Sequence, residues 1–547
     1  MLILNSIYQL ILADLRERTR QISFFVVLGI TVYLGYLMVP APDSEYNAFM
    51  FCGQRGLYNS AWVGTIFGII ASTLLSLAGF YLIKNSIARD YSTRVGLIIA
   101  STPLSKVIFI IGKWISNLIL FTIILSILTI IAFIMQLLRA EDKYLNIIEL
   151  IAPIWLIGMP TLAIVSSISI LFECIPFLRS GLGNAIYFFI WVTIIILFVG
   201  NIFQSVVDLE PHNDFFGLSR TIVDIREQII SKGFSLKDGE TDLFVPVTGN
   251  DIRIFRWTGI KWTLDIIVER LMWFCLSVLL VLSAVIPFDR FDPKKNIYNI
   301  KRKRTKTNQY LVEYLIKRFL LLKNKISYNH KLLPSLSSFV FNNTLIKINQ
   351  QNLFLIIFFE TKLLLRRQKW WWFTVAIVFN IACLIVPYDI CTRNIFPLLW
   401  LWPLTVWSAL GNQETKFNTG KIVFSISNLH CYQLPALWIT GLLVAIIAGW
   451  GPGLRFIIEG SWNNVFAWIN GALFISSLAL FLGVWSKKSG VFEIIYLIIW
   501  FIGPLIGLPF RNYYGLANGL LFLNCHVIYV LISIMLSILA LVLRKTQ

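Results

Sequence analysis

Two glycine-lysine pairs are the residues of this chain that come closest to nucleotide chemistry. A phosphate-binding loop ends in Gly-Lys-Ser or Gly-Lys-Thr, whose hydroxyl binds magnesium beside the phosphates. The pair at 112–113 is followed by Trp114, and the pair at 420–421 is followed by Ile422. Neither pair can place a hydroxyl on magnesium, so the sequence predicts that this chain does not itself bind ATP.

Histidine and cysteine, which supply many catalytic and metal-binding groups, are few and scattered. No CxxC spacing occurs, and no serine, histidine and aspartate combine in a recognisable triad. The sequence therefore predicts no catalytic residue, no metal site and no cofactor in this chain, and we do not expect it to be an enzyme by itself. The residues concerned are His212, His330, His430 and His526, with Cys52, Cys174, Cys275, Cys383, Cys391, Cys431 and Cys525.

The composition is typical of a membrane protein. Of 547 residues, 57% are hydrophobic and 14% are charged, with a mean hydropathy of +0.75, whereas a soluble chain has about 25% charged residues. The net charge of +19 arises from basic residues on alternate predicted loops, which is the bias of cytoplasmic loops. We expect the lipid bilayer, and no nucleic acid, as a partner. The apolar start runs into Asp14 and Arg16, which predicts no cleaved signal peptide.

Twelve apolar runs approach the length that crosses about 30 Å of hydrocarbon. With basic loops inside, they predict a multi-pass protein of the inner (cytoplasmic) membrane with both termini cytoplasmic. The predicted fold class is an all-α polytopic membrane protein of about twelve transmembrane helices, with interfacial amphipathic helices at 1–20 and 352–369. The runs lie near 21–40, 61–84, 108–136, 149–172, 183–202, 266–287, 371–387, 396–411, 433–450, 463–485, 491–510 and 519–543.

These runs divide into two six-span halves. Residues 1–287 form the first half, which includes an acidic loop at 203–265 that is predicted outside. Residues 288–350 form a basic cytoplasmic linker, which could also attract anionic lipid at about 1 kcal/mol per charge. Residues 351–547 form the second half. Cys52 and Cys391 fall at matching places in outside loops of the two halves, and a disulfide between them is left open.

Two stretches of the first half recur in the second half without a gap. Residues 90–114 lie over 414–438, and residues 179–191 lie over 488–500. A repeat of this kind predicts one membrane unit that is built twice. Asp90 and Glu414 head the first stretch, and the identical pairs include Gly96/Gly420, Ser101/Ser425, Trp114/Trp438, Ser180/Ser489, Gly181/Gly490, Tyr187/Tyr496 and Trp191/Trp500.

The inside loop at 85–107 combines polar residues with apolar side chains such as Leu97 and Ile98. Because the turn at 101–103 contains a proline, we expect a short amphipathic helix that ends before Pro103. A helix of this kind on the cytoplasmic face suits docking by a soluble partner. The alternative is an ordinary loop helix that only seals the membrane edge.

This loop resembles the loop between the second and third spans of type-2 ATP-binding-cassette (ABC) permeases. The resemblance rests on Asp90, Gly96, the turn at 101–105 and the Gly-Lys-Trp at 112–114, and on the order of spans over nearly the whole chain. In that family the loop is a coupling helix that fits a cleft of a separate ATPase subunit, and the turn after span four makes a smaller contact. The resemblance implies an ABC ATPase partner, in two copies, that binds ATP and Mg²⁺. The implied coupling residues are Arg89, Asp90, Arg94, Gly96, Ser101, Pro103, Glu173, Arg179, Glu414, Gly420, Ser425, His430, Lys487 and Lys488.

The chain departs from that pattern in two places. Ser427 and Asn428 stand where the first loop has Pro103 and Leu104, so the two ATPase contacts are expected to be unequal. The loop at 203–265 has no counterpart in the second half, so we do not expect the outer side to be symmetric.

Polar and ionisable groups within apolar spans often mark a transport pathway. Asn184 and Glu493 occupy equivalent positions at the inner starts of spans five and eleven, and Glu269 and Arg270 lie near the outer start of span six. These four residues are candidate pathway residues, and the alternative is that they lie at the membrane edge. The scarcity of carboxylates near mid-span favours a pump driven from outside the chain over a proton-coupled carrier.

The sequence therefore predicts the transmembrane permease subunit of an ATP-driven ABC exporter, moving an unidentified apolar or amphiphilic substrate. One alternative is a secondary transporter driven by an ion gradient. The other is a membrane scaffold whose loop at 203–265 binds another protein.

Overall fold

A computed structural model describes residues 2–40, 46–50, 54–139, 141–142, 144–179, 181–204, 214–231, 242–246, 253–291, 353–368, 370–388, 391–417, 419–420, 429–506 and 521–545. The structure is 81% helical, which confirms the all-α class. Most of the predicted linker at 288–350 and residues 421–428 of the second inside loop lie outside the described residues. The helices of the first half are α1 (Leu2–Thr19), α2 (Ile22–Leu37), α3 (Ser60–Ser72), α4 (Leu74–Ile83), α5 (Ser86–Ser92), α6 (Val95–Ser101), α7 (Lys106–Arg139), α8 (Ile147–Cys174), α9 (Gly181–Gln204), α10 (Leu218–Ser231) and α11 (Leu264–Ala284).

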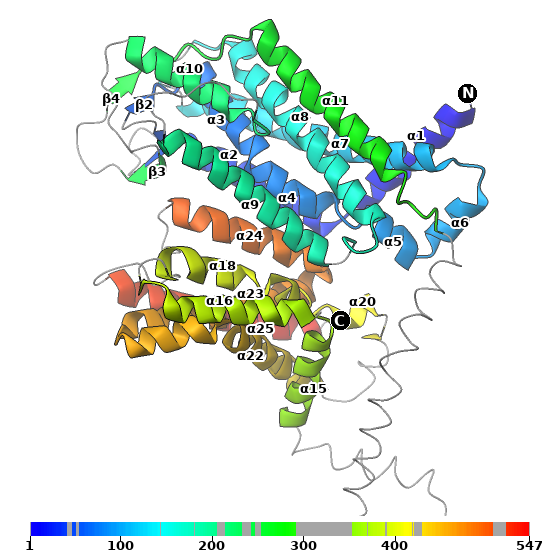
Figure 1. Cartoon of the computed structure of the whole chain (residues 1–547), viewed down its shortest axis with the longest axis vertical. Helices are drawn as coiled ribbons and strands as arrows, with labels where there is room; N and C mark the ends of the chain where they lie inside the picture. The colour runs from blue at the N-terminus through cyan, green and yellow to red at the C-terminus, as the bar shows by residue number, and fades with distance from the viewer. Residues whose placement is uncertain are drawn as a thin grey trace, which may run out of the picture.

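The second half has the same order of long helices with shorter pieces between them. Its elements are α15 (Leu353–Arg366), α16 (Trp370–Ile385), the π-helix η2 (Cys391–Ile395), α18 (Phe396–Leu401), α19 (Leu404–Trp407), α20 (Gln413–Lys416), α22 (Leu429–Ile458), α23 (Trp462–Ser486), α24 (Ser489–Ile506) and α25 (Leu521–Lys545). Figure 1 shows the first half above the second, with α24 lying between them.

Seven helices among the described residues are long and apolar enough to cross a membrane, or up to nine if each of two bent pairs is one span. The bent pairs join the predicted interfacial helices to the spans that follow: α1 meets α2 at 70°, and α15 meets α16 at 100°. Three shorter apolar helices, at 183–195, 396–407 and 489–500, coincide with predicted spans five, eight and eleven. Every predicted span therefore coincides with an apolar helix, but not every such helix has the length of a full crossing.

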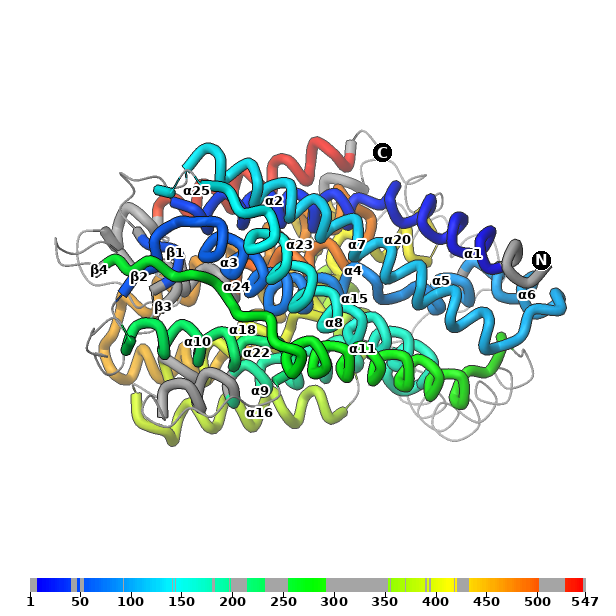
Figure 2. The backbone as a smooth tube through the Cα atoms, turned by 90° about the horizontal axis from the view of Figure 1, so that it is seen from above, coloured from blue at the N-terminus to red at the C-terminus, as the bar shows by residue number. Residues whose placement is uncertain are grey.

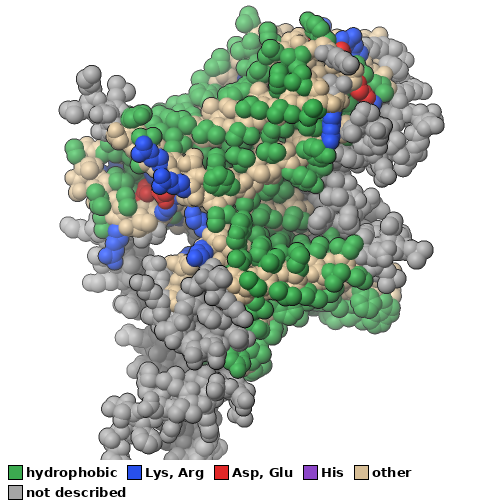
Figure 3. Space-filling view, turned by 180° about the vertical axis from the view of Figure 1, so that it is seen from behind, with side chains coloured by type: hydrophobic (Ala, Val, Ile, Leu, Met, Phe, Trp, Pro, Cys, Tyr) green, Lys and Arg blue, Asp and Glu red, His purple; other side chains and the backbone are tan. Residues whose placement is uncertain are grey.

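The outward faces of the peripheral helices are apolar. On α11, the exposed side chains include Leu264, Met272 and Leu279, while Ser277 and Val281 face the protein. Exposed apolar faces of this kind are unfavourable in water, and we expect them to contact lipid tails. Figure 3 shows the result: a broad hydrophobic surface separates charged groups that lie toward the two ends of the molecule. The protein is therefore a membrane-embedded, multi-pass protein.

Small residues let the central helices approach closely. Added Cβ atoms at Gly64 and Gly68 on α3 would lie 2.6 Å from the carbonyl oxygen of Glu149 and 3.0 Å from that of Pro153, both on α8. Glycines one turn apart are the usual means of close helix packing in lipid, where burial of apolar surface gives no driving force. The sequence thereby fixes α3 against α8 without large side chains between them.

The structure adds two small β-sheets within the predicted loops. Strand β1 (Tyr46–Met50) pairs antiparallel with β3 (Asp242–Pro246), and β2 (Gln54–Gly56) pairs parallel with β4 (Arg253–Phe255). The predicted outside loops at 41–60 and 203–265 thus meet in space, as strands whose backbone groups satisfy each other. Figures 1 and 2 place these strands at one end of the bundle and α5, α6 and the N-terminus at the opposite end.

Candidate functional site

The loop between α4 and α7 contains two short helices, α5 and α6, that lie at the end opposite the strands. Asn85 and Arg94 each adopt a left-handed backbone conformation, with φ of 72° and 63°, directly before α5 and α6. These residues break the helix that would otherwise continue from α4. The predicted single amphipathic helix is thus two helices at an angle, and the second ends at Ser101, before Pro103 as predicted.

The first turn of α5 is capped by a buried carboxylate from the last turn of another helix, α8. The side chain of Glu173, at the end of α8, accepts hydrogen bonds from the backbone N–H groups of Ser86 and Ala88 at 3.1 Å each, and from that of Ile87. A carboxylate is favourable here because the first turn of a helix has unpaired N–H groups and a partial positive charge. Glu173 is 0% exposed. It therefore fixes the loop from inside, which differs from the expectation that it contacts a partner.

The surface helix α1 is joined to this loop by a buried ionic network. Asp14 on α1 pairs with Arg18 at 2.8 Å, with Lys113 of α7 at 3.0 Å and with Arg89 of α5 at 3.2 Å. Lys113 in turn pairs with Asp90 at 2.9 Å. Asp90 is consequently buried in an ion pair, and it does not present its charge to solvent as a docking residue would.

Sequence reasoning missed Asp14, Arg18 and Lys113 as site residues. One local signal was present, because Asp14 and Arg18 are four residues apart on a predicted helix and can pair along one face. The contact with Lys113 depends on how α1 packs against α7, which no local spacing in the sequence encodes.

The second half contains a similar buried network around Glu414. This carboxylate pairs with Arg544 near the end of α25 at 2.7 Å and accepts a hydrogen bond from Gln433 of α22 at 2.7 Å. Gln433 also hydrogen-bonds Glu360 on α15, the helix that corresponds to α1. Asp90 and Glu414, predicted to be equivalent, are thus both buried, but their basic partners come from different helices.

The exposed part of the first loop combines apolar and polar side chains, with the apolar ones on α6. Ile98 is 67% exposed and Leu97 is 48% exposed on α6, and Arg94, Ser101 and Pro103 are exposed beside them. Gly96 is buried, Arg89 and Arg179 are half-buried, and Lys487 and Lys488 are exposed. Gly420 is half-buried, while Ser425 and the side chain of His430 lie outside the described residues.

The two halves approach each other at this end. Partial burial and the positive charge of Arg89 lower the pKa of Lys488, so the turn between α23 and α24 lies near α5 of the other half. The predicted second contact, the turn at 173–180, also lies beside α5, because the guanidinium of Arg179 stacks over the ring of Tyr91 at 4.2 Å.

Asn184 and Glu493, predicted to be equivalent, contact each other directly. The Asn184 side-chain amide donates to the Glu493 carboxylate at 2.7 Å, and both residues are buried. The ammonium of Lys84 on α4 donates to the Asn184 amide oxygen, and Ser408 beside α19 hydrogen-bonds Glu493. These contacts join α4 and α9 of the first half to α19 and α24 of the second.

A second pair of equivalent residues makes equivalent bonds within each half. The hydroxyl of Tyr187 on α9 donates to the carbonyl of Ser76 on α4 at 2.9 Å. The hydroxyl of Tyr496 on α24 donates to the carbonyl of Trp400 on α18 at 3.1 Å. Tyr187 and Tyr496 are separated by the same number of residues as Asn184 and Glu493. Ser76 and Trp400 are likewise separated by the same number of residues as Asp90 and Glu414.

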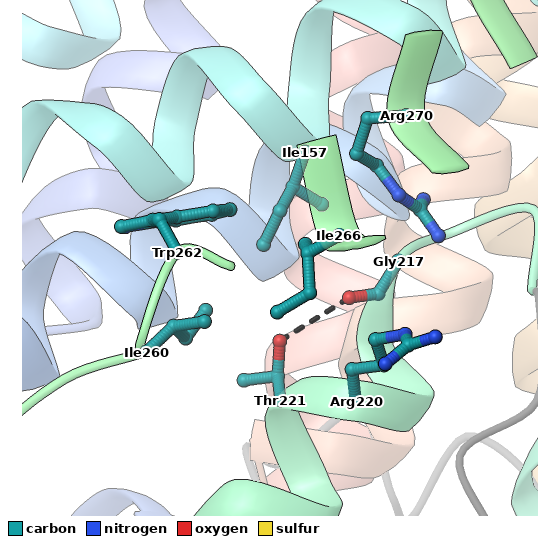
Figure 4. A pocket seen from close by; sticks show the side chains of 8 residues that line it. All are labelled: Ile157, Gly217, Arg220, Thr221, Ile260, Trp262, Ile266 and Arg270. Carbon is teal, nitrogen blue, oxygen red and sulfur yellow. Dashed lines mark hydrogen bonds between the residues drawn. The ribbon is translucent and has the colours of Figure 1, made fainter. Parts of the chain in front are cut away.

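Glu269 and Arg270 lie at the other end, far from Asn184 in the fold. Glu269 pairs with Arg220 of α10 at 2.7 Å and also with Arg270, and Arg270 donates to the backbone carbonyl of Asp214 at 3.1 Å. Burial raises the pKa of Asp214. Figure 4 shows Arg220 and Arg270 beside Gly217 around a small pocket, where Thr221 bonds the carbonyl of Gly217 at 3.2 Å. The four candidate pathway residues thus fall into two separate clusters.

No three His, Cys, Asp or Glu side chains gather as a metal site within the part of the chain that the structure describes. Cys391 is buried beside Cys383, and both are free thiols. Cys52 lies outside the described residues, so the pairing of Cys52 with Cys391 stays untested.

Comparison with protein-family models, with curated proteins and with solved structures finds no significant match. The fold and the apolar surface define the class of protein, an all-α multi-pass membrane protein. Any narrower function is inferred from the site itself.

Proposed function

We propose that this chain is the permease subunit of an ATP-driven exporter, built from two six-span halves that cross the membrane twelve times. The contact between Asn184 and Glu493 carries the proposal. In a pair of units related by a twofold axis, equivalent residues touch each other only where they lie at the axis. Asn184 and Glu493 are equivalent in the predicted repeat, so their direct contact would place them at such an axis. This supports a bundle that is built from two related halves.

The packing of the helices supports the same proposal. In the first half, α7 packs against α1, α2 and α8, and α8 packs against α11. In the second half, α22 packs against α15, α16 and α23, and α23 packs against α25. These two sets follow the same chain order, and the matched tyrosine bonds add atomic detail to it.

The inner side is proposed to be the end that carries α5, α6 and the turn at 487–488. Basic residues gather there, and the N-terminus lies at the same end (Figure 1). The exposed apolar face of α6 would dock an ABC ATPase subunit, with a second copy at the loop near Glu414. ATP and Mg²⁺ would be bound by those subunits. Their closure would move α5 and α6, and the halves would rock and part at the contact between α9 and α24, which would open a central path outward.

Co-purification of the full-length chain, in mild detergent and from its own cells, tests this proposal. We expect a nucleotide-hydrolysing subunit to co-purify with the wild type and to be lost from Ile98→Glu, because a carboxylate on α6 opposes apolar docking. Ile254→Glu is the matched control, since Ile254 is also exposed but lies on β4 at the opposite end. Absence of such a subunit from the wild type, or its equal loss from both variants, would contradict the proposal.

A carrier driven by an ion gradient is the second candidate, and Glu493 is the observation that favours it. Glu493 is a buried carboxylate at the contact between the halves, beside Lys84, and buried carboxylates serve as proton relays in transporters. Glu493→Gln keeps the hydrogen bond from Asn184 but cannot release a proton. Transport that persists without ATP, collapses with the proton gradient and is abolished in this variant would select the carrier.

A further inference from the structure

The segment that leaves α11 passes under the helices of the first inside loop. We name residues 285–291 the clasp. Its two aromatic side chains, Phe288 and Phe291, are 1% and 2% exposed. Phe288 stacks on Phe109 of α7 with ring centroids 5.3 Å apart, and Phe291 lies 4.5 Å from the ring of Tyr91 in α5. The clasp therefore belongs to the hydrophobic core that supports α5 and α6.

A glycine on α6 forms the notch that receives the clasp. A Cβ atom added to Gly96 would lie only 2.3 Å from the ring of Phe291, so no larger residue fits while Phe291 stays in place. Gly96 had been singled out from the sequence as a coupling residue. Its place in the fold is to admit Phe291, which explains the glycine without any partner.

Polar bonds fix the clasp at both ends of the loop. Arg290 donates to the backbone carbonyl of Thr102, directly after α6, at 2.8 Å. Lys106, the first residue of α7, donates to the backbone carbonyl of Phe288 at 3.0 Å. The clasp is thus bonded to residues on either side of the turn that contains Pro103.

The backbone of the clasp is held in an unfavourable conformation. Arg290 and Phe291 are consecutive residues with φ of 49° and 59°, in the left-handed region that only glycine adopts without a cost of about 1–2 kcal/mol per residue. Such strain persists only where surrounding contacts over-determine the conformation, and it is common at segments that move or switch. The contacts of the two aromatic rings and of Arg290 supply that constraint here.

We propose that Phe288 and Phe291 are positioning residues that make the exit of α11 and the helices α5 and α6 one moving body. A shift of α11 is then passed directly to the exposed face of α6, and a force on α6 is passed to α11. The mechanical link itself does not depend on what drives transport, although its use in coupling rests on the proposed function.

A reversible cross-link tests the clasp. In the double variant Gly96→Cys/Phe291→Cys, the new sulfur at 291 takes the place of the ring carbon Cγ, which lies 2.7 Å from the Cβ position of residue 96. The two cysteine side chains are thus within reach of each other, and a disulfide between them needs a shift of only a few tenths of an ångström. Under reduction the Phe291 ring is missing and the two thiols are not joined, and amide hydrogen exchange over residues 86–101 should be about tenfold faster than in the wild type, because the helices open locally. Oxidation should restore the wild-type rate.

The same sample tests coupling. In the complex with the ATPase subunit, reduction of the double variant should uncouple hydrolysis from transport, and oxidation should restore coupling; the wild type, treated identically, controls for native cysteines. If amide hydrogen exchange in the double variant does not respond to reduction, the proposal for the clasp is wrong. If oxidation restores protection from hydrogen exchange but does not restore coupling, the clasp only packs against α5 and α6 and does not transmit their movement. If no ATPase subunit exists, the proposed function fails while the exchange measurement still decides on the clasp.

Discussion

The two loops that are predicted to lie inside each contain a buried acidic residue, but they differ in which helix supplies its basic partner. In the first half, Asp90 pairs with Lys113, and the surface helix α1 joins the same network through Asp14. In the second half, Glu414 pairs instead with Arg544 on the last helix, α25. Two acidic residues that the sequence predicts to be equivalent are therefore both buried. If the two halves are repeats, a duplicated unit keeps a buried charge while a different helix neutralises it.

The largest expected effect comes from removing the central carboxylate of either network. Asp14→Ala would remove the carboxylate that Arg18 and Lys113 share, although Lys113 would keep Asp90, and Glu414→Ala would remove the carboxylate that pairs with Arg544. Loss of one partner of a buried pair costs about 3–5 kcal/mol. We expect both variants to melt well below the wild type in detergent. If one of the two variants melts at nearly the wild-type temperature, the two networks do not contribute equally to stability.

A smaller effect is expected at the cap of α5, which has no described counterpart in the second half. Glu173→Gln removes the charge from an acceptor of three backbone N–H groups, so a loss of about 1–3 kcal/mol is expected. Faster hydrogen exchange at Ile87 and Ala88 would report it. Glu459→Gln is the control, since the Glu459 side chain is 46% exposed in its pair with Arg455 and exposed pairs contribute about 0–1 kcal/mol. Equal effects of the two variants would contradict the capping role.

The matched tyrosines provide the sharpest test of equivalence between the halves. Tyr187→Phe and Tyr496→Phe each remove one buried hydrogen bond, worth about 1 kcal/mol. We expect the two variants to lower the free energy of unfolding by similar amounts and the double variant to lose the sum. Strong non-additivity would mean that the bonds depend on each other across the contact between the halves.

The smallest effect concerns the end of the bundle that carries the strands, all of which, among the described residues, lie in the first half. Burial alone would raise the pKa of Glu141, but hydrogen bonds from Arg55 and from the backbone N–H of Tyr58 outweigh it and lower the pKa below its usual 4.5. Ionised Glu141 therefore stabilises the fold above pH 4.5, and this contribution is lost as the pH falls through the lowered value. Glu141→Gln should flatten the dependence of melting temperature on pH in this acid range and leave the slope near neutrality unchanged. If the melting temperature of the variant depends on acid pH as that of the wild type does, Glu141 does not contribute to stability in this range.

The sequence predicted those features that depend on local pattern. Apolar runs located the helices, because a span must satisfy its backbone internally and face lipid. The alignment of residues 179–191 with 488–500 predicted that Asn184 and Glu493 are equivalent. Twelve full crossings, by contrast, stay a prediction, since the apolar helices at 183–195, 396–407 and 489–500 are shorter than the others.

The features that escaped the sequence depend on contacts between distant segments. Asp14 meets Lys113 only because α1 lies on α7, and the clasp meets Gly96 only because α11 returns to the first loop. The strands were missed because β1 and β3 are nearly two hundred residues apart and neither has a partner nearby in the sequence. The burial of Glu173 and Asp90 was missed because charges in loops were expected to face solvent.

The contact between the halves tests the central claim most directly. With cysteines at both Asn184 and Glu493 in the full-length chain, held in native membranes, a short thiol-reactive cross-linker should link the two positions, and mass spectrometry of the joined peptides separates this link from those of native cysteines. The account predicts that the link forms readily in the resting protein and that its yield falls when ATP is trapped on the associated subunit. A link that never forms, or that forms equally whatever the nucleotide state, would contradict a doubled bundle that is driven from outside the chain.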